Sequence, residues 1–162
     1  MTDFFVGIDN GKSGAIAIIS RKGQYIDSHK YDTQESVFSF LKGYSKIKKK
    51  SLFGIEQAIS IVGKKQSIQG TVVPFQVQGF YEGILTALGF NYELIHPKKW
   101  TEELAYSSDL KGVSVYSDRK QFFAKLAVDK FIDAPLVGSR GGLESGIADA
   151  LLIADYLRRI SK

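Results

Sequence analysis

Phe4-Phe5-Val6-Gly7-Ile8-Asp9-Asn10-Gly11 is the stretch from which the fold can be worked out. Five apolar or small residues lead without interruption to one carboxylate, and Asn-Gly, a strong turn signal, follows it. A short apolar run bounded by a turn is typical of a strand buried on both faces. Asp9 therefore stands at the end of a core strand, where an ionised carboxylate is costly unless it is paired or bound to a cation. A turn-capping role explains Asp9 equally well on this pattern alone.

Leu52-Phe53-Gly54-Ile55-Glu56-Gln57 repeats the pattern, with an apolar run, Gly-Ile, an acid and an amide. If the two strands are neighbours in one sheet, Asp9 and Glu56 lie side by side at its edge. Adjacent carboxylates repel each other, and a bound divalent cation is a common remedy. Because carboxylate oxygens are hard ligands, the pattern predicts Mg²⁺, for which Mn²⁺ can substitute.

The composition is that of an ordinary soluble globular protein. The 162 residues predict one domain over 1–162, with 44% apolar and 24% charged residues. The absence of cysteine excludes disulfides and thiolate-bound zinc, and the two histidines argue against a histidine-rich metal site. No secretory signal and no apolar run of about 20 residues is visible, so we expect a cytoplasmic protein that does not enter membranes. The net charge of +5 points weakly to nucleic acid as a partner.

Hydrophobic periodicity and turn signals predict an α/β fold with a mixed sheet. Pro74 is expected in the first turn of its helix, where proline is tolerated. The expected strands are at 4–9, 15–20, 24–31, 52–56 and 91–96, and a basic loop is expected at 46–50. The expected helices are one that starts at 33 or 34, one that ends near 88, one that starts at 97, one from 118 to about 131 and one from 145 to about 160.

Asp149 is the informative residue of the last predicted helix. It shares a helical face with Ile153, Tyr156 and Ile160, at offsets of +4, +7 and +11. That face is apolar, so we expect Asp149 to point toward the protein interior rather than toward water. The alternative is an acid favoured near the helix start by the helix dipole.

Asp9, Glu56 and Asp149 come from the first strand, the fourth strand and the last helix, an order that resembles the RNase H-like nuclease fold. The local sequences resemble the RuvC family of Holliday-junction resolvases over nearly the whole chain, and look closest to small members encoded by lactococcal phages. The similar motifs are Gly7-Ile8-Asp9-Asn10-Gly11, Ile55-Glu56-Gln57 and, most specifically, Ala148-Asp149-Ala150-Leu151-Leu152-Ile153-Ala154.

This resemblance implies an RNase H-like fold with a five-stranded mixed sheet flanked by helices. It implies a homodimeric endodeoxyribonuclease that cuts four-way DNA junctions and other branched DNA by symmetric, Mg²⁺-dependent hydrolysis in the host cytoplasm. Asp9, Glu56 and Asp149 are then the catalytic and metal-binding residues. Two metal ions held by such acids can activate water and stabilise the leaving oxygen. Gly79 and Gly83, four residues apart in one predicted helix, allow a second copy to approach closely.

The family usually carries a fourth acidic or histidine ligand about one turn before the last aspartate. Gly146 and Ser145 occupy those positions here, and Glu144 is the nearest carboxylate. We expect Glu144 to complete the catalytic and metal-binding set. The alternative is a weakened second metal site that needs more Mg²⁺ or works better with Mn²⁺.

Basic residues in loops near the acids are the candidates for DNA binding, although any single one of them can equally be a solvated surface lysine or arginine. Two other activities remain open: a non-catalytic junction-binding module, and an RNase H-like nuclease that cuts RNA–DNA hybrids. The segment 9–14 also resembles the phosphate loop of actin-like kinases, but those proteins need two such domains. The DNA-binding candidates are Lys12, Lys64, Lys65, Lys98, Lys99 and Arg140.

Overall fold

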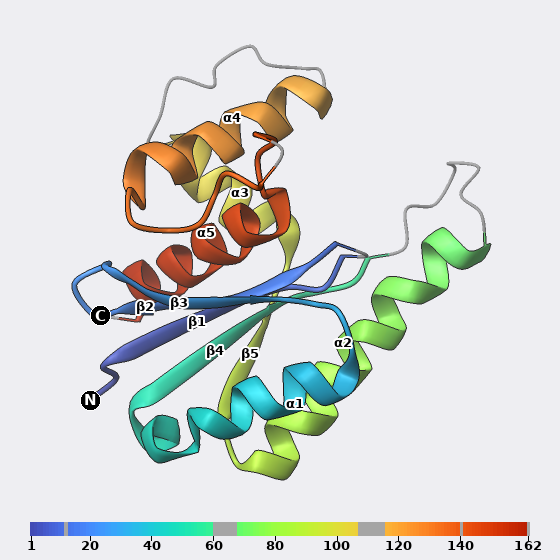
Figure 1. Cartoon of the computed structure of the whole chain (residues 1–162), viewed down its shortest axis with the longest axis vertical. Coiled ribbons are helices and arrows are strands. Elements are labelled where there is room, and N and C mark those ends of the chain that lie inside the picture. The colour runs from blue at the N-terminus through green and yellow to red at the C-terminus, as the bar shows by residue number, and fades with distance from the viewer. Residues whose placement is uncertain (12, 60–67, 107–115, 140, 162) are drawn as a thin grey trace.

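A five-stranded mixed sheet with helices on both faces forms the part of the chain that the computed structural model describes (Figure 1). The strand order is β3-β2-β1-β4-β5. This architecture is the predicted one. The described residues are 1–11, 13–59, 68–106, 116–139 and 141–161.

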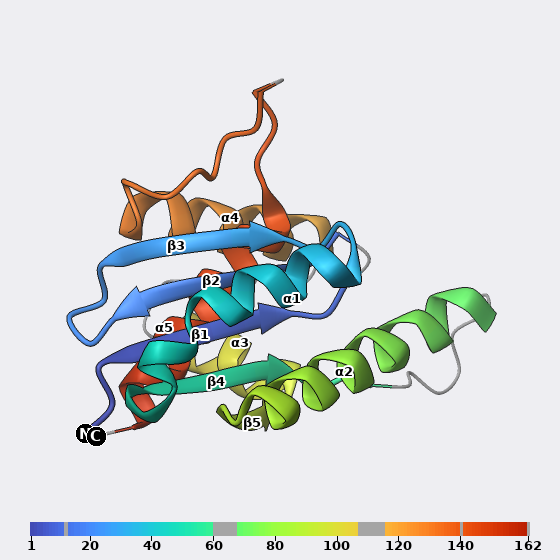
Figure 2. The same cartoon turned by 60° about the horizontal axis from the view of Figure 1, so that its bottom comes forward.

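The central strand, β1, connects the two halves of the sheet. It pairs antiparallel with β2 and parallel with β4, whereas β3 and β5 form the edges (Figure 2). The central strands are buried because apolar residues face both helical layers. The strands are β1 (Phe4–Asp9), β2 (Ala15–Ser20), β3 (Tyr25–Lys30), β4 (Ser51–Glu56) and β5 (Asn91–Ile95).

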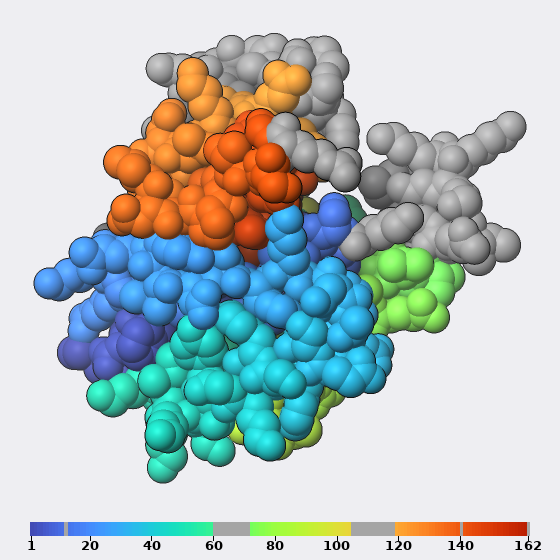
Figure 3. All heavy atoms as spheres, in the orientation of Figure 1, coloured from blue at the N-terminus to red at the C-terminus, as the bar shows by residue number. Residues whose placement is uncertain are grey.

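In the described residues the helices are α1 (Gln34–Gly43), η1 (a 3-10 helix, Ser45–Lys50), α2 (Ile68–Leu88), α3 (Pro97–Tyr106), α4 (Tyr116–Lys130) and α5 (Ser145–Ile160). Helix α5 lies against one face of the sheet with α3 and α4 beside it, and α1 and α2 cover the other face (Figures 1 and 2). In the space-filling view, β3 and α1 form the surface toward the viewer, with α4 above them (Figure 3). No helix within these ranges is both long and apolar enough to span a membrane.

Gly7 allows α5 to touch the central strand. A Cβ atom at this position would overlap the backbone carbonyl of Ala150 and crowd the backbone nitrogen of Ala154. The glycine in the opening motif therefore serves helix–sheet packing. Because α5 lies directly on β1, residues at its start and at its end reach opposite ends of that strand.

Three sequence expectations are wrong in detail. Residues 46–50 belong to η1 instead of a loop, since the Ile47 and Ser51 backbone N–H groups donate to carbonyls three residues earlier. Pro74 lies inside α2, beyond its first turn, because the helix begins already at Ile68. Ile160, expected on a buried face, is 50% exposed at the end of α5. The basic composition of residues 46–50 and the position of Pro74 are local signals, and neither of them predicted the observed helix correctly.

Asp155, which the sequence analysis did not single out, is a fully buried carboxylate in the second half of α5. Its Oδ1 accepts hydrogen bonds from Nε and Nη2 of Arg158 at 3.1 and 2.8 Å. Its Oδ2 accepts from Nε of Arg159 at 2.8 Å and from Nζ of Lys130 in α4. Burial alone would raise the pKa of Asp155, but these hydrogen bonds and positive charges outweigh it and hold the pKa below its ordinary range.

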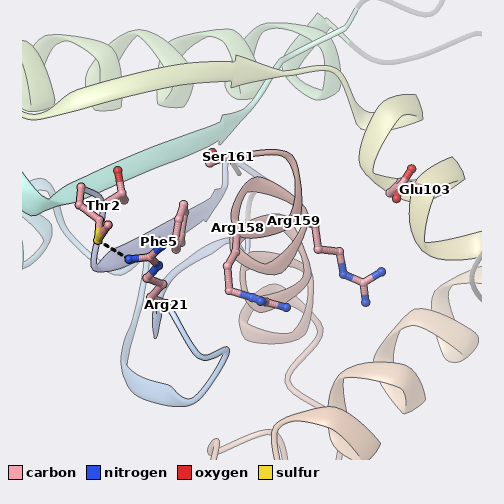
Figure 4. Close-up of a pocket in the computed structure, with 8 residues that line it drawn as sticks. Thr2, Phe5, Arg21, Glu103, Arg158, Arg159 and Ser161 are labelled. Atoms are coloured by element: carbon pink, nitrogen blue, oxygen red, sulfur yellow. Dashed lines mark hydrogen bonds between the residues drawn. The ribbon is translucent and has the colours of Figure 1, made fainter.

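Both arginines also border an open cavity of about 910 Å³ at the amino end of β1, where Phe5 lies (Figure 4). Figure 4 shows them extending from the last turn of α5, with Arg21 near the start of the chain. Positive charge complements the negative end of a helix dipole. Since Arg158 and Arg159 also neutralise Asp155, this end of α5 is a structural anchor, at the opposite end of β1 from Asp9.

Replacing Asp155 with asparagine should lower the free energy of unfolding by about 3 kcal/mol, because three cations lose a buried partner. The pKa of Asp155 lies below its ordinary value of 3.8 in the folded protein, so its stabilisation is present above that pH. It is lost as the pH falls through the folded-state pKa. Urea denaturation at neutral and acidic pH measures both effects. Asp129→Asn, at an exposed position of α4, is the control and should change stability by less than about 0.5 kcal/mol. Equal stability of the two variants at neutral pH would contradict the anchor role.

Candidate active site

Parallel pairing places two acids at one edge of the sheet. Ile8 of β1 is paired with Ile55 of β4, so Asp9 and Glu56, the next residue in each strand, emerge side by side. Asp149 lies in the second turn of α5 and reaches the same place. All three carboxylates line one cavity of about 500 Å³, here called the acid cavity. The structure therefore brings these three predicted site residues together.

The pKa values of all three acids are raised. Burial is the main cause, and the negative charge of Asp9 adds to it for the other two acids. Together they raise the pKa of Glu56 to about 8 and that of Asp149 to about 7. For Asp9, the backbone N–H of Gly11, 2.9 Å from Oδ1, partly opposes the effect of burial. Ionising all three groups is therefore costly without a compensating cation.

Asn10 ties the two acid-bearing strands together. Its side chain is 4% exposed, and Nδ2 donates to the backbone carbonyl oxygen of Glu56 at 2.6 Å. In the sequence analysis, Asn10 was interpreted only as the first residue of an Asn-Gly turn. The pattern that could have identified it is an amide that directly follows the acid at the end of an apolar strand, as Gln57 also follows Glu56.

Trp100, in the first turn of α3, contacts Glu56 directly. Its indole Nε1 donates to Oε1 of Glu56 at 2.9 Å, which lowers the pKa of that acid against the larger effect of burial. The ring of Phe123 in α4 packs against the indole, with 5.3 Å between ring centroids. A sequence separation of 44 residues between Trp100 and Glu56 hides this contact from sequence analysis.

Positive charge faces the acids from α4. Arg119 and Lys120 line the acid cavity, and the charge of Lys120 lowers the pKa of both Asp9 and Asp149. Sequence reasoning missed this pair, although two adjacent basic residues just before Phe122 and Phe123 were a visible signal.

Of the six predicted DNA-binding residues, two lie in the part of the chain that the structure describes. Lys98 lines the acid cavity and lies 3.7 Å from Glu102, whereas Lys99 is exposed on the same turn of α3. Their contact with DNA stays a prediction. The other four candidates, Lys12, Lys64, Lys65 and Arg140, lie outside the described residues.

Glu144 lies apart from the other three acids. It occupies the N-cap position of α5, and its Oε1 lies 2.6 Å from Nζ of Lys30 at the end of β3. A Cβ added at Gly138 would overlap this same Oε1, so a glycine there leaves room for the Glu144 side chain, which is not among the residues that line the acid cavity. The structure thus does not bring Glu144 to the cavity, and its role as fourth ligand stays a prediction.

The ligand atoms that the acid cavity offers are of the type that divalent cations bind. Three carboxylates offer hard oxygen ligands, as Mg²⁺ and Mn²⁺ prefer, and a cation would offset the cost of ionising them in this buried place, which is the main cause of their raised pKa values. Among the described residues, no three acidic, histidine or cysteine side chains stand close enough to hold an ion as they are. Asp9, Glu56 and Asp149 therefore fit a cation by chemistry and location, and holding one requires their side chains to draw together.

Without metal, the folded protein should lose stability as the pH rises from about 5 to about 8.5. The folded-state pKa values of about 8 for Glu56 and about 7 for Asp149 exceed the ordinary ones, so both acids ionise more easily in the unfolded chain. Added Mg²⁺ should raise the melting temperature, and more at the higher pH, because the cation competes with protons. Differential scanning fluorimetry measures both, with Glu56→Gln as the comparison that should flatten the pH and metal responses. A melting temperature that is insensitive to Mg²⁺ at both pH values would contradict this account.

Comparison with solved structures identifies the fold. The chain superposes on Thermus thermophilus RuvC in complex with a Holliday junction substrate, with a TM-score of 0.63 and 13% identity over 98% of this chain and 96% of that one. A second structure of Thermus thermophilus RuvC also gives a TM-score of 0.63 and 13% identity, over 97% and 96% of the two chains. No protein-family model and no curated protein sequence matches the chain. The prediction of an RNase H-like fold is thereby confirmed, and the chain shares that fold with RuvC.

Proposed function

We propose that this protein is a divalent-metal-dependent endodeoxyribonuclease of the RuvC type, which resolves four-way DNA junctions as a homodimer. One observation carries the proposal: Asp9, Glu56 and Asp149, from β1, β4 and α5, line one cavity beside Arg119 and Lys120. The fold supports it, because a RuvC of the same fold is known in complex with a Holliday junction substrate. The closer relation to phage-encoded resolvases is part of the proposal and rests on the sequence motifs alone.

The roles of the residues follow from their chemistry. Asp9, Glu56 and Asp149 would hold the cations, and Glu144 would join them if its ion pair with Lys30 opened. Bound Mg²⁺ supplies the activation of water and the neutralisation of phosphate charge that hydrolysis requires. Water would attack phosphorus and the bond to the 3′ oxygen would break, which leaves 5′-phosphate and 3′-hydroxyl ends.

Arg119 and Lys120 would attract the scissile phosphate into the acid cavity, where the acids alone would repel it. Both side chains are exposed, so they are accessible to DNA. Arginine can grip a phosphate with two parallel hydrogen bonds, whereas lysine acts as a point charge. Lys98 borders the same cavity from α3 and would contact a neighbouring part of the backbone.

A non-catalytic junction-binding module is the second candidate function. The observation that favours it is the position of Glu144, which is paired with Lys30 instead of facing the acid cavity. Such a module would bind four-way junctions and leave them uncut in Mg²⁺ and in Mn²⁺. Cleavage assays on a four-way junction, a DNA duplex and an RNA–DNA hybrid separate this module from a resolvase and from a hybrid-cutting nuclease.

Asp9→Asn should reduce junction cleavage by at least about 100-fold, because the substitution removes one charged metal ligand at the centre of the site. Junction binding should remain within about threefold of the wild type, since the basic residues are unchanged. Asp133→Asn, at an exposed position after α4, serves as the matched control with normal cleavage. Normal cleavage by Asp9→Asn at saturating Mg²⁺ would overturn the assignment.

Replacing Arg119 or Lys120 with glutamine should weaken junction binding and flatten its salt dependence. Each lost phosphate contact should change the slope of log K against log salt by about 0.9. The control is Lys42→Gln, because Lys42 is exposed on α1, on the other face of the sheet. Fluorescence anisotropy over a salt series provides the slopes. A slope equal to that of the wild type in Arg119→Gln and Lys120→Gln would exclude both residues from the DNA interface.

The exposed side of α2 supports the proposed homodimer. Beyond the backbone of α2 itself, a Cβ at Gly79 or Gly83 would meet no atom of the described residues within 4 Å, and Val72 and Phe75 are 41% and 43% exposed near them. An exposed apolar strip interrupted by glycines is suited to close packing of a helix from a second copy. A two-fold axis through this strip would give two active sites for two symmetric cuts.

Gly79→Glu combined with Gly83→Glu should convert the dimer to a monomer, because charged side chains would fill the space for the partner helix. Sedimentation velocity at micromolar concentration should then show only the 18.0 kDa species. The control is Gly43→Glu, at another exposed and open glycine, which should leave the dimer intact. A wild-type protein that sediments as a monomer would contradict the proposed assembly.

A further inference from the structure

The single tryptophan of the chain lies beside Glu56 because of how the sheet is paired. Glu56 is opposite Ile95 in the parallel ladder of β4 and β5, and α3 begins at Pro97, two residues later. The backbone N–H of Lys98 donates to Nδ1 of His96 at 3.1 Å, which caps the start of α3. The short connection thus fixes where the first turn of α3, with Trp100, meets the end of β4.

The indole has little freedom to move away from the acid. Trp100 is 4% exposed, and its ring packs against Phe123 within the core on the α5 side of the sheet. A buried indole N–H needs an acceptor, and Oε1 of Glu56 provides it at 2.9 Å. Rotating the indole away would open the core and leave this donor without its partner.

Glu56 is consequently held at two points. Asn10 binds its backbone carbonyl, and Trp100 binds one oxygen of its carboxylate. Among the described residues no hydrogen bond or ion pair to Oε2 is found, and the carboxylate lines the acid cavity. The hydrogen bond from the indole therefore holds one oxygen of the carboxylate in place and leaves the other available to a ligand in the cavity.

We propose that Trp100 is a positioning residue, which orients the carboxylate of Glu56 for a divalent cation in the acid cavity. This inference rests on the proposed function and extends it to an uncharged residue, which lines the acid cavity and would act on the cation through Glu56. In metal sites of known proteins, hydrogen-bond partners of the ligands commonly tune affinity in this way. A purely structural Trp100 would affect stability alone.

Trp100→Phe is the decisive variant, because phenylalanine keeps an aromatic ring in the core and removes the N–H donor. Calorimetric titration of the DNA-free protein with Mn²⁺ should show an affinity about 10- to 100-fold weaker than that of the wild type. In cleavage assays, half-maximal activity should need correspondingly more Mg²⁺, while the Kd for the junction stays unchanged.

Leu104→Ala provides the matched control for lost packing. Leu104 is buried in the same helix and the same hydrophobic cluster as Trp100, and it does not line the acid cavity. This variant should melt at a lower temperature than the wild type and still bind Mn²⁺ with wild-type affinity. Weaker binding by both variants to the same degree would reduce Trp100 to a packing residue and overturn the proposal.

Tryptophan emission gives a second readout, since Trp100 is the only source of it. Titration with Mg²⁺, which is not paramagnetic, should change the emission of the wild type and leave that of Glu56→Gln unchanged. Trp100→Phe with wild-type Mn²⁺ affinity would overturn this inference alone, provided that Asp9→Asn has lost metal binding. A wild-type protein that binds no Mn²⁺ would overturn the proposed function and this inference together.

Discussion

Parallel pairing of β1 with β4 is the interaction on which the candidate site depends. It forces two carboxylates, Asp9 and Glu56, to leave the sheet at the same edge. The side chain of Asn10 holds the two strand ends together, and Gly7 lets α5 lie on β1 closely enough to bring Asp149 to the same cavity. The fold therefore concentrates negative charge at a place where burial makes ionisation costly.

Helix α5 carries one half-buried acid in its first half and one buried acid in its second half, and their electrostatic surroundings are opposite. Asp155 is surrounded by Lys130, Arg158 and Arg159, and its pKa is lowered. Asp149 has no such ion pair among the described residues, and its pKa is raised to about 7 by burial and by Asp9. An acid whose charge is fully compensated serves stability. An acid left uncompensated at the edge of a cavity is typical of a functional site.

Sequence analysis predicted what local patterns encode. Apolar runs that end in an acid located Asp9 and Glu56, and helical periodicity placed Asp149 on an inward face. The contacts that hold the site together were not predictable, because they join distant positions: Trp100 with Glu56, and Lys30 with Glu144. Asp155 shares a helical face with Leu151 and Leu152, and Arg158 and Arg159 follow it at i+3 and i+4, so its burial and two of its cations left a sign in the sequence that the sequence analysis overlooked. Only its contact with Lys130, 25 residues away, depends on the folded chain.

In the proposed site, the acids of β1, β4 and α5 together bind a divalent cation. Anomalous diffraction from a crystal grown with Mn²⁺ tests this binding most directly, because manganese is located independently of any activity. An anomalous peak is expected in the acid cavity, within about 2.5 Å of carboxylate oxygens from Asp9, Glu56 and Asp149. A map with no peak in that cavity at saturating Mn²⁺, or with manganese bound only elsewhere, would contradict the proposed site.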